Sequence, residues 1–267
     1  MKNILKTLVV LLVAGLLTAC STQKIDEKVI RVGATPAPHA QILEVIKPLV
    51  EAKGYTLEIV EFTDYILPNK ALDTKELDAN YFQHVPYLTS FNEKNNTDLT
   101  AVLKVHFEPL GLYPGKTASI EALQKGATIA VPNDDTNEAR ALALLEANGL
   151  IKINPAKVAS ATVLDIVENK LDLKFVELEA AQLARSLGDV DLAVINGNYA
   201  LEAKIDSTVL LTEDKDSAAA DTYANVLVVR TGDEETAKTK VLIEALSSQE
   251  VADYIEANYY PTVIPAF

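Results

Sequence analysis

The chain contains one cysteine, no tryptophan and only three histidines among its 267 residues. A single cysteine excludes an internal disulfide. The ten glycines are widely spaced, with the nearest two at Gly111 and Gly115, so neither a dinucleotide-binding fingerprint nor a phosphate-binding P-loop can be written. No serine lies in a G-x-S-x-G motif, and no H-E-x-x-H sequence is present. The common signatures of nucleotide-binding proteins and hydrolases are therefore missing.

Basic residues are also scarce, with 24 Lys and Arg against 38 Asp and Glu and a formal net charge of −14. Nucleic acid is excluded as a partner, because few cations could neutralise a run of phosphates. Electrostatic docking on anionic lipid is excluded for the same reason. Because 49% of the residues are hydrophobic, the chain can still bury a core.

The lone cysteine follows a hydrophobic N-terminal segment. Two lysines precede a ten-residue apolar run that ends at Leu17, and this run is too short to span a bilayer, which needs about 20 residues. Residues 1–19 are therefore predicted to be a signal peptide, whose loss of two lysines changes the charge from −14 to −16. The tetrapeptide LTAC resembles the lipobox of bacterial lipoproteins, which implies cleavage before Cys20 and acylation of its thiol. The alternative is an ordinary secretory signal cut near Ala19.

Residues 20–28 are polar and lack periodicity, and they are predicted to form a lipidated, flexible tether. Beyond them, short apolar runs alternate with segments of helical period, which predicts an α/β fold with mainly parallel sheets. The predicted strands are Val29–Gly33, Thr56–Phe62, Thr128–Val131, Val190–Asn196 and Asn225–Arg230. The predicted helices are Ala40–Lys53, Glu138–Asn148, Glu177–Leu187 and Glu234–Asn258, the last interrupted near Ser247.

Two segments rich in turn-forming or small polar residues, Glu108–Ala118 and Asp214–Thr222, divide the chain. They predict that a second lobe is inserted into the first and that the chain then returns. The expected limits are 29–112 and 225–267 for lobe 1, and 113–224 for lobe 2.

The three histidines, His39, His84 and His106, are scattered along the chain. With a carboxylate they could converge on a metal ion in space, so a metal-ion receptor is one alternative function. Each could equally form ordinary hydrogen bonds in a loop or pocket wall. An enzyme is a further alternative, although no catalytic pair stands out among 38 acids.

Three segments place polar side chains beside aromatic ones, namely LDANYFQHVPYL, VINGNY and YANV. The segment LDANYFQHVPYL contains Phe82 and His84, and forms either a pocket wall or a loop whose aromatics enter the core. Asn196 and Asn225 lie at the ends of predicted strands, where asparagine can end a sheet or hold the ammonium and carboxylate of a small zwitterion.

Arg140 is the candidate for binding an anion. It follows the cluster of helix-capping residues PNDDTN and is expected in the first turn of a helix, where the helix dipole disfavours a cation. A residue that breaks a local rule tends to be functional, and Arg140 could grip a carboxylate with two parallel hydrogen bonds. The alternative is a surface pair with Glu138 or Asp134.

The chain resembles the methionine-binding lipoproteins of bacterial ABC importers, the NlpA-type lipoprotein family. The resemblance spans the mature chain and is carried by the motifs GATPAPHA, EFTDYILPN, LDANYFQHVPYL, EPLGLY, PNDDTNEARAL, INGNYALEA and YANVLVVR. It implies a two-lobed, type II-like periplasmic-binding-protein fold with the ligand in a cleft between the lobes. It further implies that Arg140 binds the ligand carboxylate and that Asn196 and Asn225 belong to the pocket. Tyr65 and Phe82 would flank the ligand side chain, with His84 nearby.

The implied function is that of a non-enzymatic receptor without a cofactor. It would capture methionine and deliver it to an ABC permease and ATPase complex. The D-isomer, a methionine-containing dipeptide or another apolar amino acid stays open as the ligand. The lipid on Cys20 would anchor the chain to the cell membrane, facing the extracytoplasmic side. Asp135 and Lys204 depart from the proline and glycine usual in the family, and Asp135 would add an acid beside the anion site.

Overall fold

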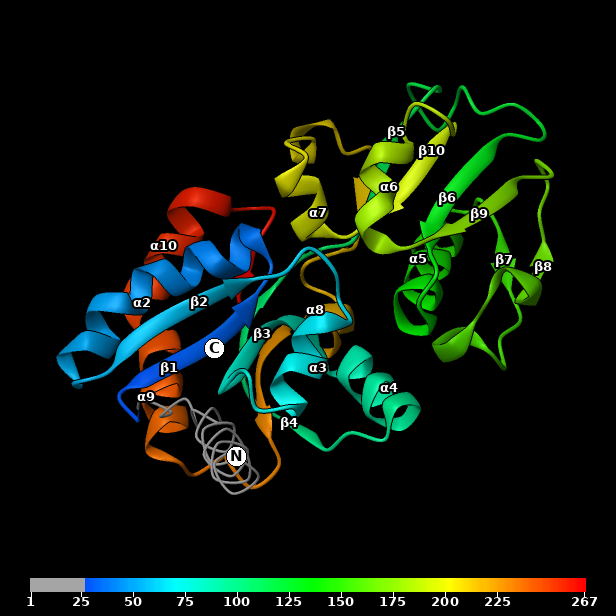
Figure 1. Ribbon diagram of the computed structural model, residues 1–267. Helices are drawn as coiled ribbons and strands as arrows, with labels where there is room; N and C mark the ends of the chain where they lie inside the picture. The colour runs from blue at the N-terminus through cyan, green and yellow to red at the C-terminus, as the bar shows by residue number, and fades with distance from the viewer. Residues whose placement is uncertain (1–26) are drawn as a thin grey trace, which may run out of the picture.

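The computed structural model describes residues 27–267 (Figure 1). The predicted signal peptide, Cys20 and most of the predicted tether lie outside the described residues. Within residues 27–267, no helix has the length and apolar character that crossing a membrane would require.

The strands form two main sheets, one in each of two lobes (Figure 1). The first sheet has the order β13-β4-β12-β3-β1-β2, and the second has the order β11-β5-β10-β6-β9. The first contains β1 (Val29–Ala34), β2 (Thr56–Glu61), β3 (Ala79–His84), β4 (Leu99–Phe107), β12 (Asn225–Arg230) and β13 (Ile264–Pro265). The second contains β5 (Gly111–Pro114), β6 (Thr128–Pro132), β9 (Lys174–Leu178), β10 (Leu192–Ile195) and β11 (Leu211–Thr212), and β7 (Lys152–Ile153) pairs separately with β8 (Ile166–Glu168).

The chain passes between the two sheets twice, at residues 108–110 and 213–224. Strand β12 arrives from the second passage and enters the first sheet antiparallel to both β3 and β4. In the second sheet, β5 runs antiparallel to β10. The expectation of mainly parallel sheets is therefore wrong, because strands that cross between lobes run against the parallel strands of each.

Helices cover both faces of the first sheet (Figure 1). In the first lobe the helices are α2 (Gln41–Ala52), α3 (Leu67–Asp73), α4 (Val85–Asn95), α9 (Ala237–Leu246) and α10 (Gln249–Tyr259), preceded by a π-type turn, η1 (Pro36–Ala40). The second lobe contains α5 (Asp135–Ala147), α6 (Ala180–Ser186) and α7 (Gly197–Glu202), and α8 (Ala218–Thr222) lies on the second passage. Leu227 of β12 packs in the core of one face and Val228 in that of the other, as the alternation of a strand requires.

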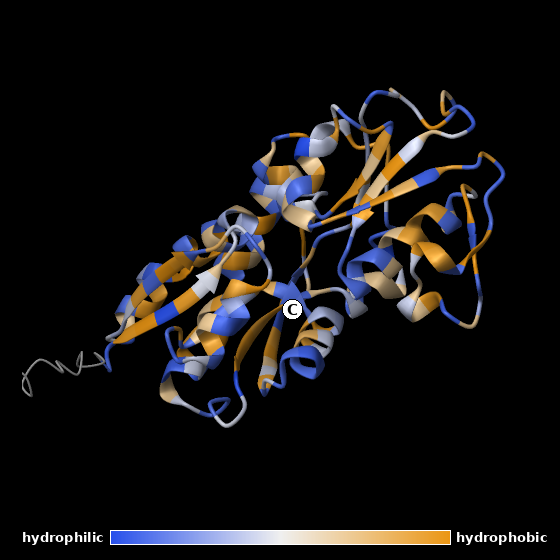
Figure 2. Ribbon diagram, turned by 45° about the vertical axis from the view of Figure 1, so that its right-hand side comes forward, coloured by the Kyte–Doolittle hydropathy of each residue, from blue (hydrophilic) through white to orange (hydrophobic). Residues whose placement is uncertain are grey.

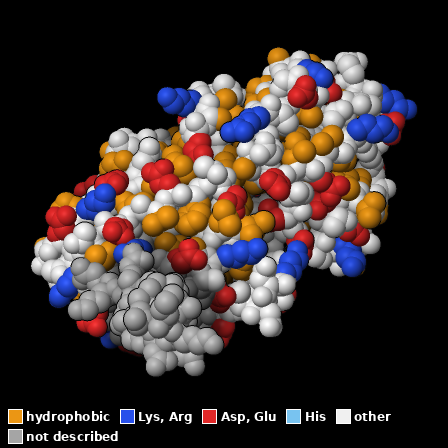
Figure 3. Space-filling model, in the orientation of Figure 1, with side chains coloured by type: hydrophobic (Ala, Val, Ile, Leu, Met, Phe, Trp, Pro, Cys, Tyr) orange, Lys and Arg blue, Asp and Glu red, His pale blue; other side chains and the backbone are white. Residues whose placement is uncertain are grey.

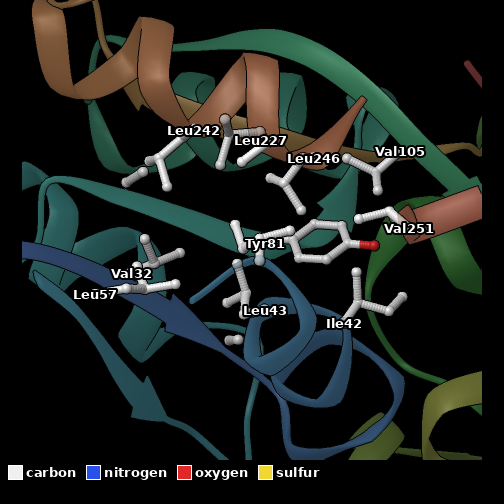
Figure 4. Packing of buried hydrophobic residues seen from close by; sticks show 14 of the residues in the cluster. Val32, Ile42, Leu43, Leu57, Tyr81, Val105, Leu227, Leu242, Leu246 and Val251 are labelled. Atoms are coloured by element: carbon white, nitrogen blue, oxygen red, sulfur yellow. The ribbon is translucent and has the colours of Figure 1, made fainter. Parts of the chain in front are cut away.

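The core of the first lobe lies between α2, α9, α10 and the sheet. Ile42, Ile46 and Val50 recur at helical spacing and bury one face of α2. Figure 4 shows the ring of Tyr81 from β3 among Leu43 and the side chains of α9 and α10. In Figure 2 the strands of both sheets are largely hydrophobic, whereas the helices carry both hydrophobic and hydrophilic residues. Burial on both faces of the sheets explains the short continuous apolar runs in the sequence.

The five predicted strands and the interruption near Ser247 are confirmed, within a few residues at the ends. Helix α2 continues through Pro48. The predicted helix Glu177–Leu187 is wrong at its start, because β9 extends to Leu178 before α6 begins. Helix α5 begins at Asp135, three residues earlier than predicted. Arg140 therefore lies in the second turn of α5, and the expectation that it opposes the dipole in the first turn is wrong.

Candidate ligand-binding site

A partly open cavity with an empty volume of about 340 Å³ lies between the two lobes. All six residues predicted from the sequence line it: Tyr65, Phe82, His84, Arg140, Asn196 and Asn225. The other lining residues are Gln83, Tyr87, Glu108, Asn137, Gly197 and Asn198. The structure therefore brings together side chains that are separated by as many as 160 positions along the chain.

Strand ends and one helix start position these side chains. Asn225 begins β12 and lies in register with His84 on one neighbouring strand and His106 on the other. Asn196 follows the last residue of β10 and precedes α7. Arg140 reaches the cavity from α5, whose N-cap Asp134 accepts a hydrogen bond from the backbone N–H of Asn137. Each element thus carries one polar group to the interface between the lobes.

Aromatic rings form one wall of the cavity. The ring of Tyr65 lies 5.8 Å from that of Phe82, 5.8 Å from that of Tyr87 and 5.1 Å from that of Tyr199, measured between centroids. The hydroxyl of Tyr65 donates to Asn198 Oδ1 at 2.5 Å, across the two lobes. Such a wall suits an apolar or thioether side chain, since each sulfur–aromatic contact is worth about 0.3–1.5 kcal/mol.

Hydrogen bonds fix the protonation of His84. The backbone N–H of Tyr87 donates to Nδ1 at 3.2 Å, so the proton of the neutral ring is on Nε2, which donates to Asn137 Oδ1 at 3.2 Å. Burial lowers the pKa of His84 to about 3, and the charge of Arg140 adds to this effect. His84 is therefore neutral at physiological pH and contributes no charge to the cavity.

The amide oxygen of Asn196 is a buried cavity atom without a hydrogen-bond partner within residues 27–267. The amide nitrogen of Asn198 lies beside the Glu202 carboxyl, which is absent from the cavity lining. Asn196 Nδ2 donates to Asn137 Oδ1 at 2.9 Å, so only its acceptor is left over. A buried polar group without a partner costs about 1–3 kcal/mol. The free acceptor, Asn196 Oδ1, therefore indicates a ligand that has a hydrogen-bond donor.

Arg140 is paired inside the protein. Its Nε donates to Glu213 Oε1 at 2.8 Å and its Nη2 to Glu213 Oε2 at 2.5 Å, while Nη2 also donates to the carbonyl of Glu108 at 2.8 Å. Nη1 makes no hydrogen bond to any described residue. The edge formed by Nε and Nη2 is thus occupied by Glu213, and Nη1 is the nitrogen left for a ligand.

The alternative partners predicted for Arg140 are wrong. Glu138 Oε1 instead accepts from the backbone N–H of Val163 at 2.8 Å, and Asp134 accepts from Asn137. These acids cannot reach the guanidinium because it turns away from the start of its own helix, toward the passages between the lobes.

Two residues that depart from the family pattern lie away from the cavity wall. Asp135 is exposed and pairs with Lys94 of α4 at 2.5 Å, so the expectation that it places an acid beside the anion site is wrong. Lys204 has a φ of 56°, the left-handed conformation that glycine adopts without strain.

The histidines do not form the predicted metal site. The rings of His39 and His106 lie 4.9 Å apart, and with Glu108 they place one potential ligand atom each within 4.8 Å of one another, but His84 is outside this group. The hydroxyl of Tyr81 hydrogen-bonds to His106 Nδ1, which leaves the Nε2 proton to be donated to Glu108 Oε1 at 2.6 Å. In this arrangement the two imidazoles and Glu108 form a hydrogen-bonded cluster.

Burial sets the ionisation of this cluster. It lowers the pKa of His39 to about 4 and that of His106 to about 3, and it raises the pKa of the Glu108 carboxyl. Both imidazoles are therefore neutral, and the cluster supplies Glu108 with donors without adding a positive charge.

Two α/β lobes around a cavity lined by an arginine, amides and aromatic rings define a solute-binding protein of the periplasmic-binding-protein fold. A protein from Burkholderia cenocepacia, described as a nutrient-binding protein bound to methionine, has the same fold. It aligns with a TM-score of 0.84 at 39% identity, over 89% of this chain and 100% of that one.

The chain belongs to the NlpA lipoprotein family, whose model matches residues 30–267. It is 39% identical to the methionine-binding lipoprotein MetQ of Bacillus subtilis, over 99% of both chains. It is also 39% identical to the membrane lipoprotein TpN32 of Treponema pallidum, over 97% of this chain and 96% of that one. The resemblance inferred from the motifs is confirmed.

Proposed function

We propose that this chain is the substrate-binding lipoprotein of an ABC importer and that its cavity binds methionine. The observation that carries the proposal is the set of unpaired polar atoms around the aromatic wall. Among residues 27–267 they comprise two donors, Arg140 Nη1 and Asn225 Nδ2, and one acceptor, Asn196 Oδ1. A carboxylate needs donors and an ammonium needs acceptors, so the set complements an α-amino acid.

The proposed orientation follows from these atoms. The ligand carboxylate lies against Arg140 Nη1 and the amide nitrogen of Asn225, whose oxygen is already bound to His39 at 3.1 Å. The ammonium donates to Asn196 Oδ1. The thioether lies against Tyr65 and Phe82, the ring pair of the aromatic wall. A desolvated carboxylate needs such pairing, since an unpaired charge in the interior is strongly unfavourable.

The proposal extends to the rest of the chain. Cleavage before Cys20 and acylation of its thiol would hold the protein on the extracytoplasmic side of the cell membrane. There it would deliver its ligand to a permease and ATPase complex. The relatives named as membrane and methionine-binding lipoproteins support this assignment. We further propose that residues 29–112 with 225–267, and residues 113–224, form the lobes that close over the ligand.

Calorimetric titration of residues 21–267, which include every described helix and strand, tests the proposal. We expect one binding site for L-methionine, and weaker binding of leucine and alanine, which lack the thioether. D-methionine and a glycyl-methionine dipeptide, titrated alongside, establish which form is preferred. Arg140→Ala should weaken methionine binding by about a hundredfold, because it leaves the ligand carboxylate without its charged partner. No heat with any methionine form at millimolar concentration would contradict the proposal.

A further inference from the structure

Glu213 forms an ion pair with Arg140 on the side of the guanidinium that faces away from the cavity. The two side chains are 9% and 5% exposed, and the carboxylate accepts from both Nε and Nη2 of the guanidinium. The backbone N–H of Leu110, on the first passage between the sheets, also donates to Glu213 Oε2 at 2.8 Å. Glu213 itself lies at the start of the second passage and is absent from the cavity lining. It therefore makes no direct contact with a ligand in the cavity, and its influence is that of its charge.

The orientation of the guanidinium is fixed on several sides. The guanidinium carbon Cζ of Arg140 lies 4.4 Å from the centroid of the Tyr223 ring and 5.7 Å from that of the Phe107 ring. The carbonyl of Glu108 holds the second hydrogen of Nη2. The negative charge of Glu213 is consequently held at a constant place relative to the nitrogen that faces the ligand.

The charges around the cavity sum to no net positive charge. Arg140 contributes one positive charge and Glu213 cancels it at hydrogen-bond distance. The remaining ionisable acid of the wall, Glu108, can only add negative charge, and the histidines at the cavity and behind Glu108 are neutral. An arginine is thus present for hydrogen bonding, but its charge is compensated before any ligand arrives.

We propose that Glu213 makes the site select a zwitterion over a monoanion. An α-amino acid carries an ammonium and a carboxylate and is neutral in sum, whereas its deaminated analogue would bring an uncompensated negative charge into a desolvated cavity. This inference rests on the proposed function in one respect, that Arg140 receives the ligand carboxylate.

Removing the charge of Glu213 affects the two kinds of ligand differently. Both carry the carboxylate, so the stronger attraction of an uncompensated Arg140 benefits both equally. Only the zwitterion carries an ammonium, which the uncompensated guanidinium repels. Only the charge of Glu213 is changed, so its distance to the ammonium decides the effect: for charges about 10 Å apart at an effective dielectric constant of about 20, Coulomb's law gives roughly a tenfold change in affinity.

A purely structural role for Glu213 leads to another result. If the residue only orients Arg140 or stabilises the lobes, its loss weakens the carboxylate contact that both ligands share. The two dissociation constants would then rise together and their ratio would stay the same. The ratio therefore separates a role in charge selection from a role in positioning.

The test measures the dissociation constants of L-methionine and of 4-(methylthio)butanoate, which lacks only the amino group, in the unsubstituted chain, Glu213→Gln and Glu213→Asp. We expect the ratio to shift by about tenfold toward the butanoate in Glu213→Gln. It should stay unchanged in Glu213→Asp, which keeps the charge. A ratio in Glu213→Gln within about twofold of the unsubstituted value overturns the inference. If the unsubstituted chain binds no methionine, the proposed function itself fails.

Glu213→Gln leaves a buried guanidinium without its anion and can prevent folding. The same charge is then tested by comparing Arg140→Gln with the double variant Arg140→Gln/Glu213→Gln. The double variant should bind the butanoate, relative to methionine, about tenfold better than the single variant does. Equal ratios in the two variants overturn the inference.

Discussion

The asparagine side chains of the cavity have two roles: some form hydrogen bonds only within the protein, and others keep a polar atom available for a ligand. Asn137 uses its oxygen for His84 and Asn196 and its nitrogen for Asp134, so nothing is left for a ligand. Asn196 donates into this network but keeps its oxygen unpaired. A network that holds the donor of Asn196 in place thereby fixes the direction of its acceptor, and this prepares the site for an ammonium group.

Asn196→Leu should lower the affinity for methionine by about tenfold or more, because the ligand ammonium loses an acceptor worth about 1–3 kcal/mol. Leucine has nearly the same volume, so the cavity keeps its shape. Titration calorimetry measures the change. Asn148→Ala, at the exposed C-cap of α5, is the matched control and should bind as the unsubstituted chain does. Unchanged affinity in Asn196→Leu would remove this residue from the site.

The buried histidines give the fold a dependence on pH. Their pKa values are lowered by burial, to about 4 for His39 and about 3 for both His84 and His106, below the usual 6.5. Between pH 6.5 and about 4 the unfolded chain therefore binds more protons at these residues, and they make the folded state less stable as the pH falls. Burial raises the pKa of the Glu202 carboxyl to about 7, which acts in the opposite sense.

His84→Gln isolates one of these contributions. The free energy of unfolding should fall less steeply with decreasing pH in the variant, by up to about 1.4 kcal/mol per pH unit between pH 6.5 and 3. Denaturant titrations at pH 7, 6, 5 and 4 measure the slope. Identical slopes for the variant and the unsubstituted chain would show that His84 is not buried in its neutral form.

Half of the residues that line the cavity could be predicted from the sequence, whereas Glu213, which pairs with Arg140 outside the lining, could not. Asn198, Tyr87 and Asn137 lie inside the motifs that drew attention to the site, so polar and aromatic clustering could have found them. Glu213 gave no such signal, because its partner Arg140 is 73 positions away and only the tertiary fold brings them together. Local patterns identify groups on one element, whereas ion pairs between elements leave no periodic trace.

At the scale of the element, helix capping and strand burial determined which helices and strands could be predicted from the sequence. Helix α5 was predictable because Asp134 and its neighbours mark a helix start, although the boundary was three residues late. Strand β3 was not predicted, because all six of its residues are buried and several are polar. Asn80 and Gln83 satisfy one another and Asn69 through buried hydrogen bonds, so polar side chains lie where a core strand would normally be apolar.

Asp134→Ala tests the link between the cap of α5 and the cavity. The variant loses the bond to the backbone N–H of Asn137, which should cost about 1 kcal/mol of stability. It also frees the Asn137 side chain, so the affinity for methionine should fall. Thr236→Ala removes the corresponding cap of α9 and is the control, which should lose stability but keep its affinity. Equal affinities in both variants would show that the cap does not position the site.

At the scale of the whole molecule, the lobes are joined by contacts on more than one side of the cavity. Tyr65 reaches Asn198, and Tyr199 donates to the carbonyl of Thr63 at 3.2 Å. Farther out, the exposed ion pair of Lys94 and Asp135 joins α4 to α5. Acidic and basic side chains are interspersed over the face shown in Figure 3, so the acidic excess does not form one large patch there. The net charge of the chain therefore does not indicate which ligand the cavity binds.

The pair of Lys94 and Asp135 should stabilise the closed arrangement of the lobes. Asp135→Asn should weaken methionine binding by about two- to fivefold at low ionic strength, since exposed pairs contribute little, and the difference should vanish at 1 M salt. Titrations at both salt concentrations measure it. Glu244→Gln, which breaks an exposed pair with Lys53 inside the first lobe, should leave the affinity unchanged. A deficit in Asp135→Asn that persists at 1 M salt would contradict an electrostatic origin.

The most direct test of the central claim is a crystal structure of residues 21–267 grown with selenomethionine as the ligand. The only methionine of the chain is Met1, which this fragment lacks, so any anomalous selenium signal marks the ligand. We expect a single peak inside the cavity beside Tyr65 and Phe82, with the ligand carboxylate within hydrogen-bond distance of Arg140. A peak outside the cavity, or none at saturating ligand, would contradict the account.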